Sequence, residues 1–159
     1  MAASQAYLDA LKVLARRELS EAQVRQRLAR QGHEPDAIDS AVARLREERA
    51  IDDARAAEAI ARRESSVRHH GKLRVHRQLE QAGIADATAR QAVDSVFGSI
   101  DTDLPLEASL TRRLRGRHRI ADDAEFRRLY RYLVGQGFEP ERVMRALKSR
   151  RAHTAHEEE

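Results

Sequence analysis

The sequence of 159 residues contains no cysteine. This absence excludes disulfide bonds, thiol catalysis and cysteine-based zinc sites, and it fits the reducing cytoplasm, where we expect the protein to act. No run of 18 or more apolar residues occurs either, so we expect no transmembrane helix and no membrane partner. The N-terminal segment carries charged residues and lacks the apolar region of a signal peptide.

Glycine, proline and aromatic residues are scarce, with seven glycines, three prolines and an aromatic fraction of 4%. The abundant residues include Ala, Arg, Leu, Glu and Gln, which all favour helices, and few residues are present that would break a helix. The sequence also lacks the alternating pattern of β-strands. The composition therefore predicts an all-α protein.

The sequence offers no recognisable catalytic or cofactor site. No glycine-rich phosphate loop follows a strand, and the seven histidines show no metalloprotease spacing with acidic residues. We interpret His69, His70 and His76 as part of a polar segment rather than as metal ligands. We therefore expect no catalytic residue, no metal and no cofactor, and a protein that is not an enzyme.

Three copies of one pattern align on Gly32, Gly83 and Gly137. In each copy a leucine precedes the glycine by four residues, and an alanine follows it by nine. The stretches QGHEP and QGFEP are the same joint in the first and third copies. The pattern predicts three tandem three-helix repeats, similar to helix-turn-helix units, in an elongated curved array. The predicted boundaries are 1–50, 51–98 and 99–151 for the repeats and 152–159 for a flexible acidic tail.

Each of these glycines is expected to close a helix in the left-handed conformation that glycine adopts at little cost. In such a Schellman ending, the residue after the glycine packs on the leucine that precedes the glycine by four residues. We interpret His33 as a surface ring lying on its leucine rather than as a ligand. Pro35 and Pro140 then suit the first turn of the following helix. The predicted contacts are Leu28 with His33, Leu79 with Ile84 and Leu133 with Phe138.

Short polar pairs mark the starts of helices. Ser20 with Gln23, and Asp122 with Glu125, have the spacing of capping boxes. Either Asp52 or Asp53 is expected to cap a helix rather than to serve as a catalytic carboxylate. The helices that lead the three repeats are predicted at residues 7–17, 52–63 and 106–115.

Over nearly the whole chain, the pattern resembles the RecX family of recombination regulators. The resemblance rests on the stretches RRELSEAQVRQRL, LREERAIDDARAAEAIARR, LRVHRQLEQAGI and FRRLYRYLVGQGFEPERVMRAL. Two places depart from the usual family pattern. Ala56 stands where an aromatic residue normally follows the acidic pair, and residues 69–72, His-His-Gly-Lys, stand where a Gly-Tyr-Gly-Pro-like stretch is common.

The resemblance implies a regulator of homologous recombination and DNA repair. Members of the family bind filaments of the recombinase RecA on single-stranded DNA, lodge in the filament groove, and suppress ATP hydrolysis and strand exchange. We therefore expect the RecA filament and its single-stranded DNA as partners. Weak direct binding to DNA stays open as a further property. We expect the protein to be a monomer. Capping of filament ends and coating of the groove both stay open.

Two other functions are compatible with three-helix repeats. One is a sequence-specific helix-turn-helix DNA-binding regulator, and the other is a helical scaffold without a role on DNA. The third helices of the first and third repeats are mostly apolar, whereas a recognition helix should offer Arg, Asn or Gln to base edges. The composition of these helices argues against a sequence-specific DNA-binding regulator.

Basic residues form two groups, in a chain with 30 Lys and Arg against 26 Asp and Glu. The second helices of the middle and third repeats carry an arginine pair on the face opposite their apolar residues, where the first repeat has glutamines. A denser group follows the leading helix of the third repeat. Guanidinium groups bind phosphates and carboxylates well, although a single arginine is more often simply solvated. The candidate binding residues are Lys72, Arg74, Arg77, Arg112, Arg113, Arg115, Arg117, Arg119, Arg127, Arg128 and Arg131.

Tyr130 and Tyr132 lie near these arginines. Either ring can stack on a base, but aromatic residues at helical spacing are more often part of a core. Because aromatic residues are so few, we do not expect a single-strand binder that depends mainly on stacking.

Overall fold

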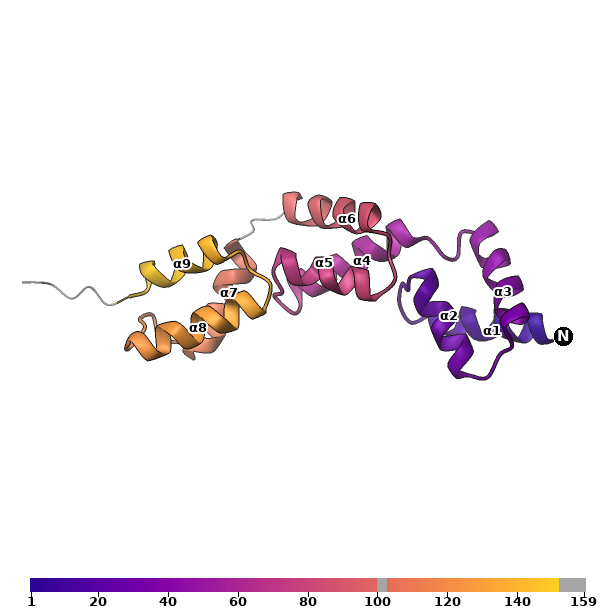
Figure 1. Cartoon of the computed structure of the whole chain (residues 1–159), viewed down its shortest axis with the longest axis horizontal. Coiled ribbons are helices and arrows are strands. Elements are labelled where there is room, and N and C mark those ends of the chain that lie inside the picture. Colours follow the sequence, from indigo (N-terminus) through magenta and orange to yellow (C-terminus); the bar gives the residue numbers. More distant parts are fainter. Residues whose placement is uncertain (100–102, 152–159) are drawn as a thin grey trace, which may run out of the picture. The chain divides into compact units, whose positions relative to one another are not determined.

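The computed structural model describes residues 1–99 and 103–151, and within them the chain forms nine α-helices (Figure 1). The β-type pairing in this part of the chain is one isolated bridge between Ile120 and Arg151. The predicted all-α fold is confirmed, whereas the predicted acidic tail lies outside the described residues. The helices are α1 (Ala2–Leu14), α2 (Glu21–Arg30), α3 (Pro35–Glu47), α4 (Asp53–Ser66), α5 (Lys72–Gln81), α6 (Asp86–Ser99), α7 (Asp103–Leu114), α8 (Asp123–Gly135) and α9 (Pro140–Ser149).

The chain forms two compact units. The first contains Met1–Arg63 and His76–Val96, and the second contains Glu64–Val75 and the described residues from Phe97 onward. The division therefore passes through α4, α5 and the end of α6. The repeat boundaries inferred from the sequence stay a prediction.

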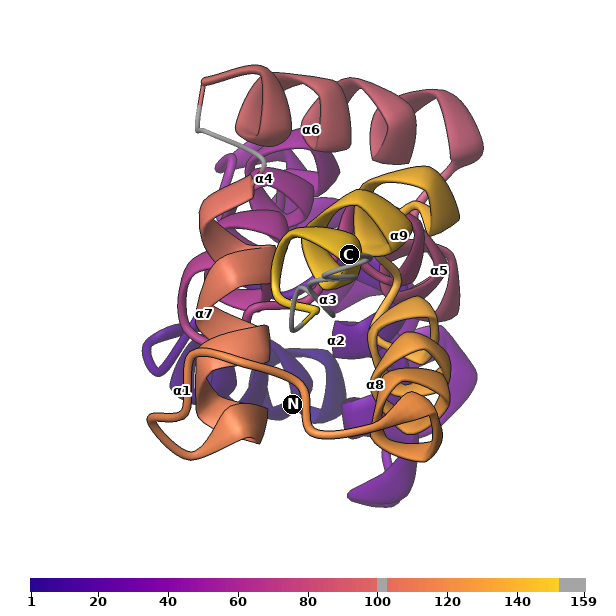
Figure 2. The same ribbon diagram turned by 90° about the vertical axis from the view of Figure 1, so that its left-hand side faces the viewer.

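Apolar residues at helical spacing build a core within each terminal helix triplet. In the first triplet, α1 and α3 lie against each other through small residues, among them Ala6 and Ala41, which let the two backbones approach closely. In the third, Leu110, Leu133 and Leu147 are fully buried and bring α7, α8 and α9 together (Figure 2). Positions from all three helices thus share one core in each of these triplets.

The three glycine joints have the predicted geometry. Gly32, Gly83 and Gly137 have φ angles of +88°, +75° and +95°. Two backbone bonds close each helix: the glycine amide donates to the carbonyl three residues before it, and the next amide donates to the leucine carbonyl. Ile84 and Phe138 are buried, as expected for the contact that accompanies this motif.

His33 differs from the other two residues at this position. Its side chain is 13% exposed, and its Nε2 lies 2.9 Å from Oδ2 of Asp9 in α1. The interpretation as a surface ring is therefore wrong. The sequence pattern identified the joint, but the partner comes from a helix 24 residues earlier.

The helix starts confirm one capping box and modify the other. Ser20 and Gln23 exchange both bonds of the box. Asp122 accepts the amide of Glu125 at 2.7 Å, but the Glu125 carboxylate accepts the amide of Ala121 instead of that of Asp122. Only half of the second predicted box therefore forms.

The two adjacent aspartates before α4 have separate roles. Asp52 caps α4, because its Oδ1 accepts the amide of Arg55 at 3.0 Å. Asp53 accepts the amide of Glu21 at 2.9 Å, at the start of α2. The leading helices also differ in extent from the prediction: α1 begins five residues earlier, α4 continues to Ser66, and α7 begins at Asp103.

Two of the glycine joints also receive the start of an earlier helix. The Ser20 hydroxyl, at the start of α2, donates to the carbonyl of Ala82, and the amide of Gly71, at the start of α5, donates to that of Gln136. Ser20 and Gly71 occupy equivalent positions, one residue before their helices. At Gly83 and Gly137 a Cβ atom would overlap Ala22 and Arg74, whereas at Gly32 nothing lies within 4 Å.

Candidate functional site

Positive charge is concentrated in the part of the chain that forms the third helix triplet. Residues 103–151 contain 13 Lys and Arg against 7 Asp and Glu, a net charge of +6. Residues 1–50 contain 9 against 8, and residues 51–98 contain 8 against 7, so each has a net charge of +1. Fields of this kind attract polyanions, so the third triplet is the first place to seek a phosphate contact.

An arginine-rich loop of residues 115–119 joins α7 to the segment before α8. Both flanking residues, Leu114 and Ile120, are buried in the core, and the Ile120 amide donates to the carbonyl of Arg150 at 3.0 Å. Arg115 and Gly116 have φ angles of +51° and +80°, which turn the chain sharply after α7. The loop is thus fixed at both ends while its basic side chains are exposed.

Arg117 within this loop pairs with Glu125 of α8. Both terminal nitrogens of the guanidinium reach the carboxylate, one of them at 3.3 Å. Together with the Ala121 amide, Arg117 lowers the pKa of Glu125 below its ordinary value. The pair therefore holds the loop against α8, so Arg117 is a structural residue as well as a candidate contact.

Arg113 and Tyr132 form a second link between α7 and α8. The Arg113 guanidinium carbon lies 3.8 Å from the centre of the Tyr132 ring, a distance typical of a cation–π contact. Because an arginine covers this face of the ring, Tyr132 is poorly placed to stack on a base. Among the described residues, no cation lies over the Tyr130 ring.

The other basic side chains of this region extend into solvent. Each is exposed, and in the described part of the chain none forms an ion pair or a side-chain hydrogen bond. The two links just described keep the loop and α8 side by side, so these residues form a third-repeat basic surface. Its members are Arg112, Arg115, Arg119, Arg127, Arg128 and Arg131.

The candidates on α5 are less uniform. Lys72 and Arg77 are exposed, as predicted. Arg74 is half-buried: its backbone lies against Gly137, and its Nη1 lies 3.5 Å from the carbonyl of Gly135. The predicted outward position of Arg74 is therefore wrong, because α5 uses this side to contact the joint between α8 and α9.

Sequence reasoning missed two cations on α9. Arg145 and Lys148 are exposed, and neither side chain has a partner among the described residues. Their i, i+3 spacing places them on one helix face beside Met144. That spacing was the signal in the sequence that would have found them.

The three histidines singled out in the sequence do not share one polar segment. His70 is buried, with Nδ1 2.8 Å from Oε2 of Glu64. His76 lies on α5, where ligand atoms of His76, Glu80 and Asp86 fall within 4.8 Å of one another and are thus able to meet at a metal ion. Both carboxylates are exposed, and Asp86 also pairs with Arg90 at 2.8 Å, so we interpret the cluster as a polar contact between α5 and α6.

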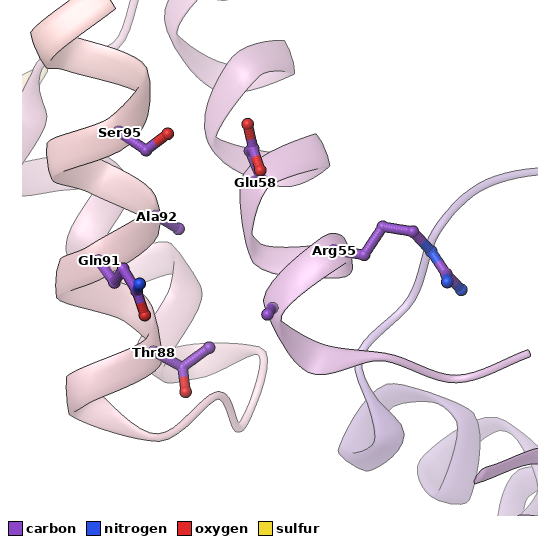
Figure 3. A pocket seen from close by; sticks show the side chains of 7 residues that line it. Arg55, Glu58, Thr88, Gln91, Ala92 and Ser95 are labelled. Atoms are coloured by element: carbon purple, nitrogen blue, oxygen red, sulfur yellow. The ribbon is translucent and has the colours of Figure 1, made fainter. Parts of the chain in front are cut away.

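A groove between α4 and α6 is lined by small and polar residues (Figure 3). Arg55 points away from α6 and pairs with Glu18 at 2.7 Å, while Glu58 pairs with Arg62 on its own helix. Thr88 and Ser95 contribute hydroxyls from α6, and the two charged residues among those that line the groove, Arg55 and Glu58, are the ones held in these ion pairs. The groove therefore offers no convergent set of reactive groups.

Comparison with known proteins identifies the relatives of the chain. The model of the first three-helix domain of RecX matches residues 6–45, and that of the second matches residues 52–93. The regulatory protein RecX of Halorhodospira halophila is 35% identical over 91% of this chain and 88% of its own length. That of Chromohalobacter salexigens is 34% identical over 87% of this chain and 88% of its own length.

Solved structures show the same fold. RecX from Lactobacillus salivarius superposes with a TM-score of 0.69 and 19% identity, over 93% of this chain and 96% of that one. A second regulatory protein RecX gives a TM-score of 0.73 and 20% identity, over 93% and 72% of the two chains. Within the described residues, no helix has the length and apolar character needed to cross a membrane.

Proposed function

The chain belongs to the RecX family of regulatory proteins, and we propose that it binds RecA filaments on single-stranded DNA and inhibits their ATP hydrolysis and strand exchange. In this role it regulates homologous recombination and DNA repair in the cytoplasm as a monomer without catalytic activity. The observation that carries the proposal is the similarity to regulatory RecX proteins over 91% of the chain.

The third-repeat basic surface is the proposed contact with the filament. Six exposed arginines that form no ion pair or side-chain hydrogen bond within residues 1–99 and 103–151 are available to bind phosphates, which accept two parallel hydrogen bonds from a guanidinium. The anchored loop keeps Arg115 and Arg119 in place, which lowers the ordering cost of binding. Lys72 and Arg77 on α5 are further candidates, whereas Arg74 contributes mainly to packing.

The direct test is a titration of this protein into RecA that hydrolyses ATP on single-stranded DNA, with DNA binding by the protein alone as a parallel measurement. Inhibition at concentrations where free DNA is hardly bound supports filament recognition. Inhibition far below one molecule per recombinase subunit supports capping of ends, and near-stoichiometric inhibition supports coating of the groove. Unchanged ATP hydrolysis at saturating protein contradicts the proposal.

A charge-reversal pair tests the basic surface. Arg115→Glu with Arg119→Glu should weaken inhibition at least about tenfold, because each lost charged contact is worth about 1.5 kcal/mol or more. The control is Arg16→Glu with Arg17→Glu, which changes the net charge equally at two exposed arginines of the first repeat. Equal effects of the two double variants would show that only total charge matters.

If the protein were instead a helix-turn-helix DNA-binding regulator, it would bind duplex DNA sequence-specifically in the presence of competitor DNA. The third helices of the repeats are poorly suited to reading a DNA groove. α3 buries Ile38, Val42 and Leu45, and α9 buries Val143 and Leu147. These faces belong to the cores of their own repeats and are not available to a DNA groove.

A further inference from the structure

The third repeat has a groove between α8 and α9 that the proposed function does not use. Its volume is about 520 Å³, within the range of small-ligand sites. The Tyr130 ring and the apolar side chains of Pro140 and Met144 line it together with two exposed cations, Arg145 and Lys148. The remaining lining residue, Glu141, is the one acid of the set.

The first repeat has the corresponding groove between α2 and α3, but there an ion pair spans it. With the joints Gly32 and Gly137 superposed, Arg25 corresponds to Tyr130 and Asp39 corresponds to Met144. Arg25 Nη1 lies 2.6 Å from Asp39 Oδ1 across the first groove, and both residues line it. The third repeat replaces this internal pair with an aromatic and a thioether side chain, which leaves the groove without a polar bridge.

Tyr130 also differs from the other two tyrosines. Arg44 lies 3.8 Å from the centre of the Tyr7 ring, and Tyr132 is covered by Arg113 in the same way. Tyr130 is half-buried, and within the described residues no cation lies over its ring and its hydroxyl makes no hydrogen bond. An aromatic face and a hydroxyl are thus both available in the groove.

We propose that this groove binds one unpaired base of a single-stranded nucleic acid, stacked on Tyr130. Arg145 and Lys148 bind the phosphates on either side of that base, and Arg127, one turn before Tyr130 on α8, extends the cationic rim. An aromatic ring beside a basic rim is the arrangement by which proteins hold single strands without reading their sequence. The inference rests on the proposed function, since the strand would be the one in the RecA filament.

Charge favours a nucleic acid over an apolar peptide segment. The rim carries three cations against Glu141, and the whole triplet has a net charge of +6. A base brings a phosphate on each side, so it matches a ring flanked by cations. A duplex keeps its bases stacked and paired, so the groove should favour single strands.

The test uses the full chain with a fluorescently labelled thymidine oligonucleotide and a duplex of the same length. Tyr130→Leu keeps an apolar side chain on the core but removes the ring, and should weaken single-strand binding roughly tenfold with little effect on duplex binding. Arg145→Gln with Lys148→Gln should weaken binding and reduce its salt dependence. Tyr130→Phe should bind like the parent.

Tyrosine emission gives a readout that packing alone would not change. The chain has three tyrosines and no tryptophan, so quenching on addition of the unlabelled oligonucleotide reports stacking on tyrosine. Tyr130→Phe should lose part of this quenching while it retains affinity. This variant preserves the ring, so it decides the question even if Tyr130→Leu is poorly folded.

Unchanged single-strand affinity in folded Tyr130→Leu, or full quenching in Tyr130→Phe, overturns the inference. If Tyr130→Leu binds the oligonucleotide normally but no longer inhibits RecA, the groove binds a protein segment instead. That outcome overturns the base-binding site and leaves the proposed function standing. A parent chain that binds the strand through Tyr130 but never inhibits RecA contradicts the proposed function alone.

Discussion

The glycine joints allow backbone strain and steric overlap to be measured separately. Gly32 has a φ of +88° with nothing within 4 Å of a built Cβ, so Gly32→Ala adds strain alone. Gly71 has no positive φ, but its Cβ would overlap the backbone of Gly137 and Phe138, so Gly71→Ala adds overlap alone. Gly137 has a φ of +95° and faces the backbone of Arg74, so Gly137→Ala adds both.

The expected losses follow from these differences. A left-handed alanine costs about 1–2 kcal/mol, which for a chain of this length lowers the unfolding temperature by roughly 2–8 °C. Overlap with a packed backbone costs about 1–3 kcal/mol more. The displaced α5 start also loses two backbone bonds, from Gly71 to Gln136 at 2.9 Å and from Leu73 to Gly137 at 3.0 Å. We therefore expect Gly137→Ala to cost about 3–8 kcal/mol in total.

Guanidinium denaturation followed by circular dichroism measures the free energies of unfolding. Hydrogen exchange then locates the damage, because Gly137→Ala should speed exchange at the amides of Gly71 and Leu73, whereas Gly32→Ala should leave both unchanged. Repeat proteins can unfold in parts, and the exchange data identify which part changed. Equal losses for Gly32→Ala and Gly137→Ala would refute the close approach of α5 to the third joint.

Two further predictions concern acidic residues. Asp52→Ala should lower the free energy of unfolding by about 1 kcal/mol, because α4 loses its cap. Asp53→Ala should lower it by a similar amount, because the Glu21 amide loses its acceptor. If denaturation shows no loss of stability for Asp53→Ala, its bond to α2 is contradicted. The pKa of Glu125 is lowered mainly by Arg117, so its ionised form stabilises the folded state above the ordinary pKa of 4.5, and this contribution is lost as pH falls through the lowered pKa. The stability difference between the parent and Glu125→Gln should therefore shrink in acid, and a difference independent of pH would be the contrary result.

Features decided by neighbouring residues in the chain could be predicted from the sequence. A left-handed glycine, a proline in the first turn and a Ser-x-x-Gln box involve residues within one or two turns, and all three are confirmed in the first repeat. Partners far along the chain could not be predicted. Asp9 reaches His33, Asp53 reaches Glu21, and neither spacing has a signature in the sequence.

The candidate site shows the same limit. The dense group of arginines and its place in the third repeat were visible in the sequence, and each arginine of the group is exposed. The sequence could not separate Tyr130 from Tyr132, because the difference is the position of Arg113 across two helices. Nor could it show that Arg117 pairs with Glu125 while the side chains of Arg115 and Arg119 have no partner in the part of the chain that the structure describes.

The glycine joint has two roles, and only one of them leaves a mark in the local sequence. All three glycines reverse the chain after a helix, and this shared role makes the repeat recognisable in the sequence. At Gly83 and Gly137 the missing side chain also admits the start of an earlier helix, whose Ser20 hydroxyl or Gly71 amide bonds the carbonyl just before the glycine. At Gly32, by contrast, nothing in the described part of the chain lies within 4 Å of a built Cβ. The same residue type thus closes a helix locally at three positions and joins successive repeats at two.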